Sequence, residues 1–258
     1  MLSLFVELYK YRQLLMRLIG RDLRVRYKRS ALGLLWAFAE PLFMMALFSL
    51  VFSFFLRINT PNYPVFVLCG IVVWSFFQTG VVYSLTAISG NSGLIKKIYF
   101  PREILPLATV FGRFVHFFLS LLLLTPFLIW FNVPFTLALL YLPILALIEL
   151  VLVCGAALML TGFCTLYEDV AFLVNFAFMG LFYVSPVFYP VEMIPLNLRP
   201  WYMLNPVASL ISAYRSVLLE GHIPALADLA PAIIFALILL VIGTKVFRHM
   251  QWQFAEVL

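Results

Sequence analysis

The sequence predicts an all-α integral membrane protein with six transmembrane helices, an N-terminal amphipathic interface helix and re-entrant helices between the fifth and sixth spans. Hydrophobic residues make up 65% of the 258 residues and charged residues 11%, and the mean hydropathy is +1.08. Soluble domains are about 45–50% apolar and about 25% charged. This chain therefore has too little polar surface to face water on all sides. In lipid every backbone amide needs an internal partner, which excludes an open sheet and favours helices.

Six apolar stretches have the length of a membrane-spanning helix. About 20 apolar residues cross the ~30 Å hydrocarbon core of a bilayer. The expected spans are residues 34–56, 65–88, 104–131, 141–165, 170–188 and 229–247. Residues 31–258 are expected to form one transmembrane domain, with residues 1–30 as the amphipathic cytoplasmic helix before it.

The distribution of basic residues predicts the orientation of these spans. Fourteen of the 17 Lys and Arg residues fall on the same side of the arrangement as the N-terminus, eight of them between Lys10 and Arg29. Cytoplasmic segments are enriched in Lys and Arg. The chain is therefore expected to be a multi-pass protein of the inner (cytoplasmic) membrane with both termini in the cytoplasm. The net charge is +6, but because the basic residues are concentrated beside the first predicted span, they are expected to face lipid headgroups and no nucleic acid partner is expected.

The first 30 residues have two different faces when written as a helix. Leu4, Leu8, Tyr11, Leu15 and Leu18 recur at spacings of four and three, which forms one apolar stripe. The basic residues on or beside another face are Lys10, Arg17, Arg21, Arg24, Arg26 and Lys28. This pattern is typical of a helix that lies along a leaflet with its apolar side toward lipid. A simple orientation signal is the alternative, but the length favours a structural collar near a pore entrance.

The loop between the second and third spans contains a short amphipathic segment. Gly90, Asn91 and Ser92 are expected to end the span and begin a short helix, which Pro101 terminates. The candidate residues of this loop are Leu94, Ile95, Lys96, Lys97, Tyr99, Phe100, Pro101, Arg102 and Glu103. Such a segment either rests on the membrane or docks a soluble partner. The sequence has no Gly-x-x-x-x-Gly-Lys-[Ser/Thr] loop for phosphate binding, so energy must come from a partner or an ion gradient, which favours docking.

The region from Tyr183 to Asp228 is largely apolar but contains six prolines. Each proline disfavours helical geometry in the residue before it, so the region is expected to consist of broken helices. Broken helices at membrane depth occur where they are buried in protein or line a cavity. We expect two re-entrant helices, over residues 189–198 and 205–219, that form an outer gate. The candidate gate residues are Pro186, Tyr189, Pro190, Pro195, Asn205 and Pro206. The alternative is an outer cap that does not move.

Aromatic residues line up on two of the predicted spans. Phe172, Phe176, Met179 and Tyr183 share a face of the fifth span, and Trp36 shares a face of the first with Glu40, Met44 and Phe48. Ring faces suit the C–H surfaces of sugars, so Trp36, Phe172, Phe176, Met179 and Tyr183 are candidates for a substrate channel. Helix packing and lipid contact are the alternatives.

Arg113, Glu149 and Glu40 are the candidate ionisable residues inside the predicted spans, where charge is costly and normally faces the protein interior. Arg113 and Glu149 differ in predicted depth by only about 5–6 Å, so an internal pair is expected. Glu40 lies nearer the inner interface. Gly155 and Gly162, one heptad apart, indicate close helix packing. The three histidines are too scattered for a metal site, and neither a catalytic residue nor a bound cofactor is expected in this chain.

Three stretches carry a family resemblance: RDLRVRYKRS at 21–30 running into LGLLW at 32–36, IYFPREILP at 98–106, and SPVFYP at 185–190 followed by Asn205-Pro206 and Tyr214-Arg215. Their order and spacing resemble the permease subunits of ABC-2 type polysaccharide exporters, and among these the O-antigen exporters. The resemblance implies a homodimer that works with two copies of a separate nucleotide-binding ATPase subunit, which binds ATP and Mg.

The resemblance also implies roles for the segments described above. The loop at 90–103 would contact the ATPase, residues 1–30 would be the interface helix, and the outer helices would form a periplasmic gate. The pore would guide a lipid-linked polysaccharide, such as the O-antigen of lipopolysaccharide, across the membrane. The alternative cargoes are teichoic acid, capsule or a small hydrophobic substrate. A membrane-embedded glycosyltransferase is less favoured because Glu168-Asp169 is the only adjacent acidic pair.

Overall fold

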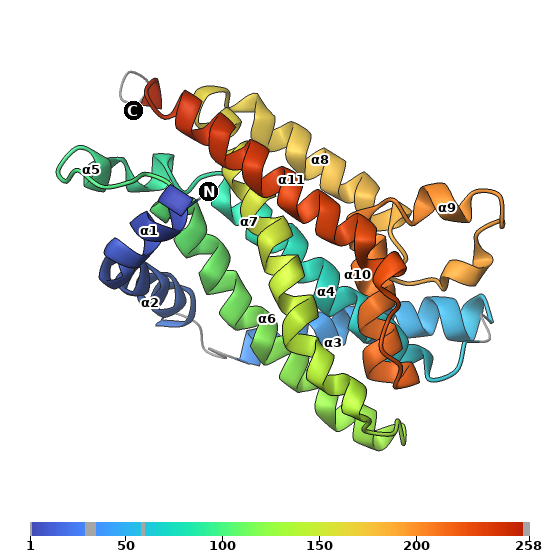
Figure 1. Cartoon of the computed structure of the whole chain (residues 1–258). Coiled ribbons are helices and arrows are strands. Elements are labelled where there is room, and N and C mark those ends of the chain that lie inside the picture. The colour runs from blue at the N-terminus through green and yellow to red at the C-terminus, as the bar shows by residue number, and fades with distance from the viewer. Residues whose placement is uncertain (1, 29–34, 58–59, 255–258) are drawn as a thin grey trace.

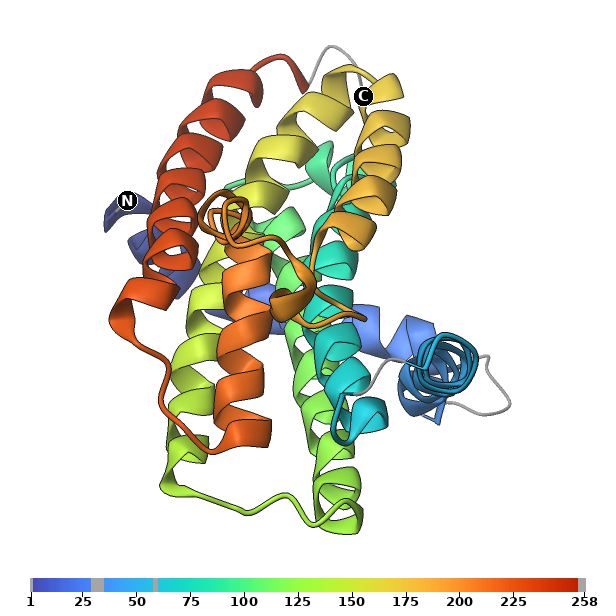
Figure 2. The same ribbon diagram turned by 90° about the vertical axis from the view of Figure 1, so that its right-hand side faces the viewer.

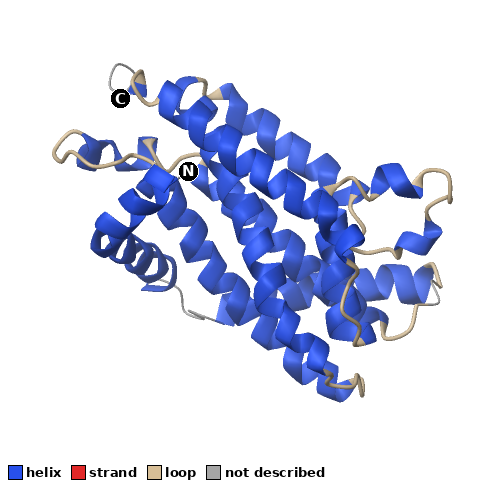
Figure 3. Cartoon of the chain, viewed as in Figure 1, coloured by secondary structure: helices blue, strands red, loops and turns tan. Residues whose placement is uncertain are grey.

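The computed structural model describes residues 2–28, 35–57 and 60–254, and for residues 2–5, 25–28 and 37 it describes the backbone alone. All secondary structure in these ranges is helical (Figure 3). The α-helices are α1 (Leu2–Lys10), α2 (Arg12–Lys28), α3 (Trp36–Phe48), α4 (Tyr63–Ser84), α5 (Ser92–Ile95), α6 (Ile104–Trp130), α7 (Leu142–Leu166), α8 (Asp169–Val184), α9 (Arg199–Tyr202), α10 (Pro206–Arg215) and α11 (Leu226–Met250). Short 3-10 turns precede α5, α7 and α9, and π-helical turns extend α3 to Phe55 and α10 to Glu220.

Five helices are long and apolar enough to cross a membrane: Phe38–Phe55, Tyr63–Ser84, Ile104–Trp130, Leu137–Leu166 and Leu226–Met250. They match five of the six predicted spans within a few residues. The sixth prediction, residues 170–188, falls on α8, which has 16 residues and therefore a length of about 24 Å. Because the helix ends at Val184, residues 185–188 were wrongly assigned to this span. The structure thus confirms an all-helical membrane protein and five candidate spans.

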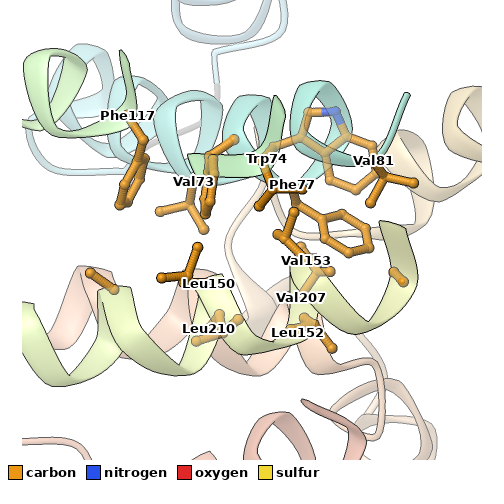
Figure 4. Close-up of a cluster of buried hydrophobic side chains, with 14 of the residues drawn as sticks. Val73, Trp74, Phe77, Val81, Phe117, Leu150, Leu152, Val153, Val207 and Leu210 are labelled. Carbon is orange, nitrogen blue, oxygen red and sulfur yellow. The ribbon is translucent and has the colours of Figure 1, made fainter. Parts of the chain in front are cut away.

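Helix α4 lies at the centre of the bundle. In its most apolar window 78% of the residues are buried, against 6% in the window Phe38–Phe55. A helix that is apolar on all sides needs burial on all sides, and α6, α7 and α10 surround α4. Figure 4 shows Val73, Phe77 and Val81 of α4 pointing toward side chains of α7. Helix α3, by contrast, lies at the periphery (Figure 2).

Helices α7 and α11 make the most extensive contact of the bundle, and glycines allow it. A Cβ atom at Gly155 would lie 2.4 Å from the backbone nitrogen of Leu240, and one at Gly243 would lie 2.2 Å from the Gly155 carbonyl oxygen. Small residues let two helix backbones approach in this way. Gly162, one heptad further, faces Met250 and Phe247 of the same partner helix. The predicted packing role of Gly155 and Gly162 is confirmed, and Gly243 is the partner that was not predicted.

The N-terminal segment forms two helices instead of the single helix predicted, with a turn at Tyr11 between them. Helix α2 packs against α6, where Leu18 is buried. Arg17, Arg21 and Arg24 are exposed. The apolar stripe therefore contacts the bundle, whereas the sequence prediction placed it toward lipid. The side chains of Arg26 and Lys28 lie outside the described residues.

Helix α1 and the C-terminal end of α11 lie at the same end of the bundle as α5 and the loop at 90–103 (Figure 1). Helix α9 and the segment around it lie at the opposite end. The bundle therefore separates the loop at 90–103 from the candidate gate residues, which lie at opposite ends. The candidate channel residues lie between them along α3 and α8.

Candidate functional site

A groove with a volume of about 270 Å³ lies between α3, α4 and α8. It is lined by apolar and aromatic side chains with a few polar groups: Glu40, Pro41, Met44, Phe48, Ile71, Trp74, Ser75, Gln78, Phe178, Met179, Phe182 and Tyr183. The indole Nε1 of Trp74 donates a hydrogen bond of 3.0 Å to Oε1 of Gln78, which fixes the ring against the groove. A surface of rings with few polar groups makes apolar contacts with a ligand and demands little of its exact position.

The groove brings together the faces that were predicted separately on the first and fifth spans. Glu40 and Met44 of α3 lie opposite Met179 and Tyr183 of α8. The other three channel candidates, Trp36, Phe172 and Phe176, do not line the groove. They are exposed, with 55%, 76% and 77% of their surface accessible, so α8 extends the groove as an open aromatic face.

Trp74 and Gln78 were missed as groove residues. Helix α4 is so uniformly apolar that its sequence pattern does not distinguish one face from another. The available signal was the polar set Ser75, Gln78 and Thr79, the cluster of hydrogen-bonding side chains within this apolar helix. Trp74 comes directly before that set.

Helix α8 ends at Val184, and the non-helical segment that follows it is completely enclosed in protein. Ser185, Pro186, Val187 and Phe188 are all buried. The ring of Phe188 stacks on Phe48 at 5.4 Å between centroids and contacts Phe52 at 4.9 Å. This arrangement joins the outer segment to α3 and places Phe188 at the centre of an aromatic cluster that also includes Phe182 and Tyr183.

The buried backbone of this break finds its hydrogen-bond partners in side chains. Arg215 donates to the carbonyl oxygens of Pro186 at 2.6 Å and Val187 at 2.7 Å, and the hydroxyl of Tyr63 donates to Phe188 at 2.6 Å. Arg215 is only 5% exposed and also stacks on the ring of Phe66, 3.4 Å from its centroid. A buried carbonyl without a donor is costly, so these donors make the non-helical segment stable inside the bundle.

The predicted outer helix at 189–198 is wrong, whereas the one at 205–219 is confirmed as a helix by α10 and its π-helical extension. Residues 189–198 contain only the 3-10 turn Val191–Met193. Pro190 and Pro195 explain the failure, because each lacks an amide donor and disfavours helical geometry in the residue before it.

The remaining gate candidates hold this region together. Asn205 caps α10 by accepting from the amide of Val207, and its side-chain nitrogen donates to Oγ of Ser185 at 3.0 Å. Pro206 occupies the first turn of α10, where a missing amide hydrogen costs nothing. The hydroxyl of Tyr189 lies 2.9 Å from that of Tyr202 and contacts the carbonyl oxygens at the end of α8. Burial raises the pKa of the Tyr202 phenol above its ordinary value, and the hydrogen bond to Tyr189 contributes to this rise.

At the opposite end, the loop at 90–103 is less helical than predicted. Helix α5 ends at Ile95, and the side chain of Asn91 bonds the Ala87 carbonyl oxygen and Arg21 in place of capping the helix. Lys96, Lys97 and Tyr99 are exposed, Tyr99 to 95%. Leu94, Ile95, Pro101 and Arg102 are partly buried, and Phe100 and Glu103 are buried. The last two residues therefore support the loop from inside.

Arg248, near the end of α11, joins three parts of the chain. Its Nε lies 2.7 Å from Oε1 of Glu103, and its Nη2 lies 2.7 Å from Oε2 of Glu7 in α1. Nearby, Nη1 of Arg102 donates to the Gln251 carbonyl oxygen at 2.5 Å. These contacts border a cavity of about 520 Å³ that is also lined by Tyr99 and Trp252. The N-terminal helix, the loop and the C-terminal end of α11 are thus held as one unit.

The two carboxylates of Arg248 are expected to differ in their effect on stability. The Glu103 side chain is 3% exposed and that of Glu7 35%. Glu103→Gln is expected to cost about 1–3 kcal/mol, because it weakens a buried charged hydrogen bond. Glu7→Gln is expected to cost less than about 1 kcal/mol. Thermal unfolding of the purified variants measures both, and equal losses would contradict a buried role for Glu103.

The predicted pair of Arg113 and Glu149 is wrong. The guanidinium of Arg113 lies 3.4 Å from the centroid of the Tyr83 ring and makes no ion pair with Glu149. Glu149 is completely buried in α7, where it faces Tyr214 of α10 without a hydrogen bond of standard geometry. Similar depth does not bring two side chains together, because the rotation of each helix decides which neighbour its residues face. Glu40, the third ionisable candidate, is exposed and lines the groove.

Within the described ranges, no three His, Cys, Asp or Glu side chains gather closely enough to hold a metal ion. The structure has a long apolar bundle with an aromatic groove along α3 and α8. The buried non-helical segment 185–188 lies at one end of the bundle, and the ion pairs of Arg248 lie at the other. Together with the five candidate spans, these features define an all-helical, multi-pass membrane protein. The chain belongs to the ABC-2 type transporter family, whose model matches residues 13–219.

Relatives with known roles extend over nearly the whole chain. An O-antigen export system permease protein RfbA of Myxococcus xanthus is 31% identical over 258 residues, 99% of each chain. One of Klebsiella pneumoniae is 30% identical over 247 residues, 95% of each chain. The polysialic acid transport protein KpsM of Escherichia coli is 22% identical over 235 residues, covering 88% of this chain and 90% of its own.

Proposed function

We propose that this chain is the transmembrane permease subunit of an ATP-driven exporter that moves a lipid-linked polysaccharide, the O-antigen of lipopolysaccharide, across the inner membrane. The observation that carries this proposal is the similarity to O-antigen export permeases over 95–99% of the chain. The aromatic groove of α3, α4 and α8 supports it, because ring faces suit the C–H surfaces of a moving glycan. Capsular polysaccharide is the second candidate, since the KpsM relative carries polysialic acid.

The proposed topology has six spans, with α8 as the short one. Both termini and the loop at 90–103 face the cytoplasm, as the distribution of Lys and Arg favours. Helices α1 and α2 are the interface helices at the inner leaflet, and α10 with its π-helical extension re-enters from the outer side. The segment Ser185–Phe188 and its neighbours then lie at the periplasmic end and form the outer gate.

The proposed assembly is a homodimer with two copies of a separate ATPase subunit, which binds ATP and Mg. Helix α3 and the face of α8 with Phe172 and Phe176 are exposed in the single chain. A single bundle packed at helix distances of about 8–10 Å leaves no room for a glycan, whereas two copies related by a two-fold axis enclose a conduit between them. Lys96, Lys97 and Tyr99 form the exposed surface that contacts the ATPase.

Removing two rings from the proposed conduit is expected to reduce export. In the double variant Phe176→Ala and Tyr183→Ala, we expect export of surface polysaccharide to fall at least about fivefold, since two ring contacts of about 0.5–1.5 kcal/mol each are lost. Cells that lack their own permease and express this chain with its ATPase subunit provide the assay. Basal ATP turnover is expected to be unchanged.

The matched control is the double variant Tyr167→Ala and Phe235→Ala. It removes a tyrosine and a phenylalanine that are 62% and 40% exposed but lie outside both the groove and the exposed aromatic face of α8. Normal export by the Phe176→Ala and Tyr183→Ala variant, or an equal loss in the control, would remove these rings from the conduit. Failure of the unaltered chain to restore export with any ATPase partner would overturn the proposed function.

A further inference from the structure

Arg113 is a buried cation that has no polar partner among the described residues. It is 7% exposed, and its Nε is buried without a hydrogen bond. Its contact with a described residue is the stacking on Tyr83, and it forms no hydrogen bond or ion pair within the described ranges. A guanidinium has five N–H donors, and leaving them unsatisfied in a low-dielectric environment is costly. The position therefore requires an acceptor from outside these residues.

A polar cavity lies where that acceptor is needed. It has a volume of about 210 Å³ and lies between α2, the end of α4 and the start of α6. Arg113 and Arg21 line it together with hydroxyl, amide and carboxyl groups and apolar side chains: Leu18, Asp22, Tyr83, Thr86, Ala87, Asn91, Leu105, Ala108 and Thr109. Nη2 of Arg21 donates to Oδ1 of Asn91 at 2.7 Å, which holds this second cation at the wall of the cavity.

From the length of α6 we place the cavity near the boundary between hydrocarbon and headgroups. Helix α6 has 27 residues and a length of about 40 Å, about 10 Å more than the hydrocarbon core. Arg113 lies nine residues after its start, about 14 Å along the helix axis. A side chain as long as arginine reaches from there toward the headgroups. The most abundant anion at this depth is the phosphate of a lipid.

We infer that the cavity between α2, α4 and α6 binds the phosphate group of a lipid, with Arg113 and Arg21 as its ligands. The two guanidinium groups offer several donors to one phosphate, and the hydroxyl of Thr86 adds one more, whereas that of Thr109 donates to the Leu105 carbonyl oxygen at 3.3 Å. With Asp22 the charged groups of the lining still sum to +1, which favours an anionic lipid phosphate over a neutral lipid. The orientation of this end toward the cytoplasmic leaflet rests on the proposed function, whereas the phosphate chemistry does not.

The source of the phosphate is either a membrane phospholipid or the diphosphate of a polyprenyl carrier. Binding to the purified full-length chain in a neutral detergent separates them. Native mass spectrometry would compare dioctanoyl phosphatidate, dioctanoyl glycerol, a polyprenyl diphosphate and inorganic phosphate. Dioctanoyl glycerol has the same chains as the phosphatidate and lacks only the phosphate.

Arg113→Gln and Arg21→Gln are each expected to weaken phosphatidate binding at least about tenfold, the effect of one lost charged hydrogen bond. Arg12→Gln is the matched control, because Arg12 lies on the same helix α2 but does not line the cavity. Arg21 is exposed, so its variant is expected to fold even where Arg113→Gln does not.

Each outcome bears on the inference. Binding that needs the phosphate and both cavity arginines supports it, and competition between phosphatidate and the polyprenyl diphosphate then identifies the source. Equal binding of phosphatidate and dioctanoyl glycerol, wild-type affinity in both arginine variants, or equally tight binding of inorganic phosphate would overturn it. Because binding is measured without transport, its failure is distinguishable from failure of the proposed export function.

Discussion

Replacing Gly155 with leucine is expected to prevent α7 and α11 from packing and to abolish accumulation of the folded protein. Even a Cβ atom at this position would lie 2.4 Å from the backbone nitrogen and 2.5 Å from the backbone carbon of the facing helix. Overpacking costs about 1–3 kcal/mol where neighbouring side chains can move. Here the obstacles are backbone atoms, so the helices themselves must separate. The expected loss of stability therefore exceeds about 3 kcal/mol.

Gly155→Ala tests the same contact with the smallest possible change, and Gly180→Ala is its matched control. Gly180 lies within α8, and no atom lies within 4 Å of a Cβ placed there. Alanine favours a helix over glycine by about 1 kcal/mol, so the control is expected to be neutral or slightly more stable. Thermal unfolding in detergent measures both variants. If Gly155→Ala unfolded at the wild-type temperature, the close approach of α7 and α11 would not exist in solution.

The spans were the most predictable part of the fold. Long apolar runs must form helices in lipid because no other structure satisfies their backbone, and this constraint is independent of the neighbours. Gly155 and Gly162 were recognised by their spacing along one helix. Gly243 was not, because its role depends on which helix lies opposite.

Features that depend on the rotation of a helix could not be predicted from the sequence. Arg113 and Glu149 were paired by depth, yet they face Tyr83 and Tyr214. Trp74 was missed in the groove because the pattern around it is apolar on every side. In each case the sequence specifies depth along the helix, and tertiary packing specifies direction.

For the proline-containing segments, the sequence predicted that the helices are interrupted but not how the interrupted backbone is buried. The structure shows why Ser185–Phe188 is buried in spite of its non-helical backbone: donors from α4 and α10 satisfy its carbonyl oxygens. Arg215 supplies two of these three donors, although the sequence analysis named it only as part of the Tyr214-Arg215 motif of the family resemblance. A cation surrounded by apolar residues was the signal that could have identified it.

Arg215→Leu is expected to destabilise the outer segment more than any other single substitution at this end. The variant leaves the buried carbonyl oxygens of Pro186 and Val187 without this donor, and it also removes a longer contact of 3.3 Å to the partly buried carbonyl oxygen of Phe66. Each unsatisfied group costs about 1–3 kcal/mol, and because such costs are not additive we expect a total of about 3–5 kcal/mol. Thermal unfolding, with limited proteolysis between Ser185 and Asn205, measures the global and the local effect.

Arg215→Lys distinguishes the geometry of the side chain from its charge. The planar guanidinium reaches the carbonyl oxygens of Pro186 and Val187 with two different nitrogens, whereas a lysine ammonium is a single point donor. Lysine is therefore expected to recover less than half of the loss. Arg199→Leu is the control, since Arg199 makes one 3.0 Å bond to the Glu192 carbonyl oxygen at the surface of the same region. A lysine variant as stable as the wild type would show that charge alone holds the segment, and a leucine variant no less stable than the control would show that the carbonyl oxygens find other donors.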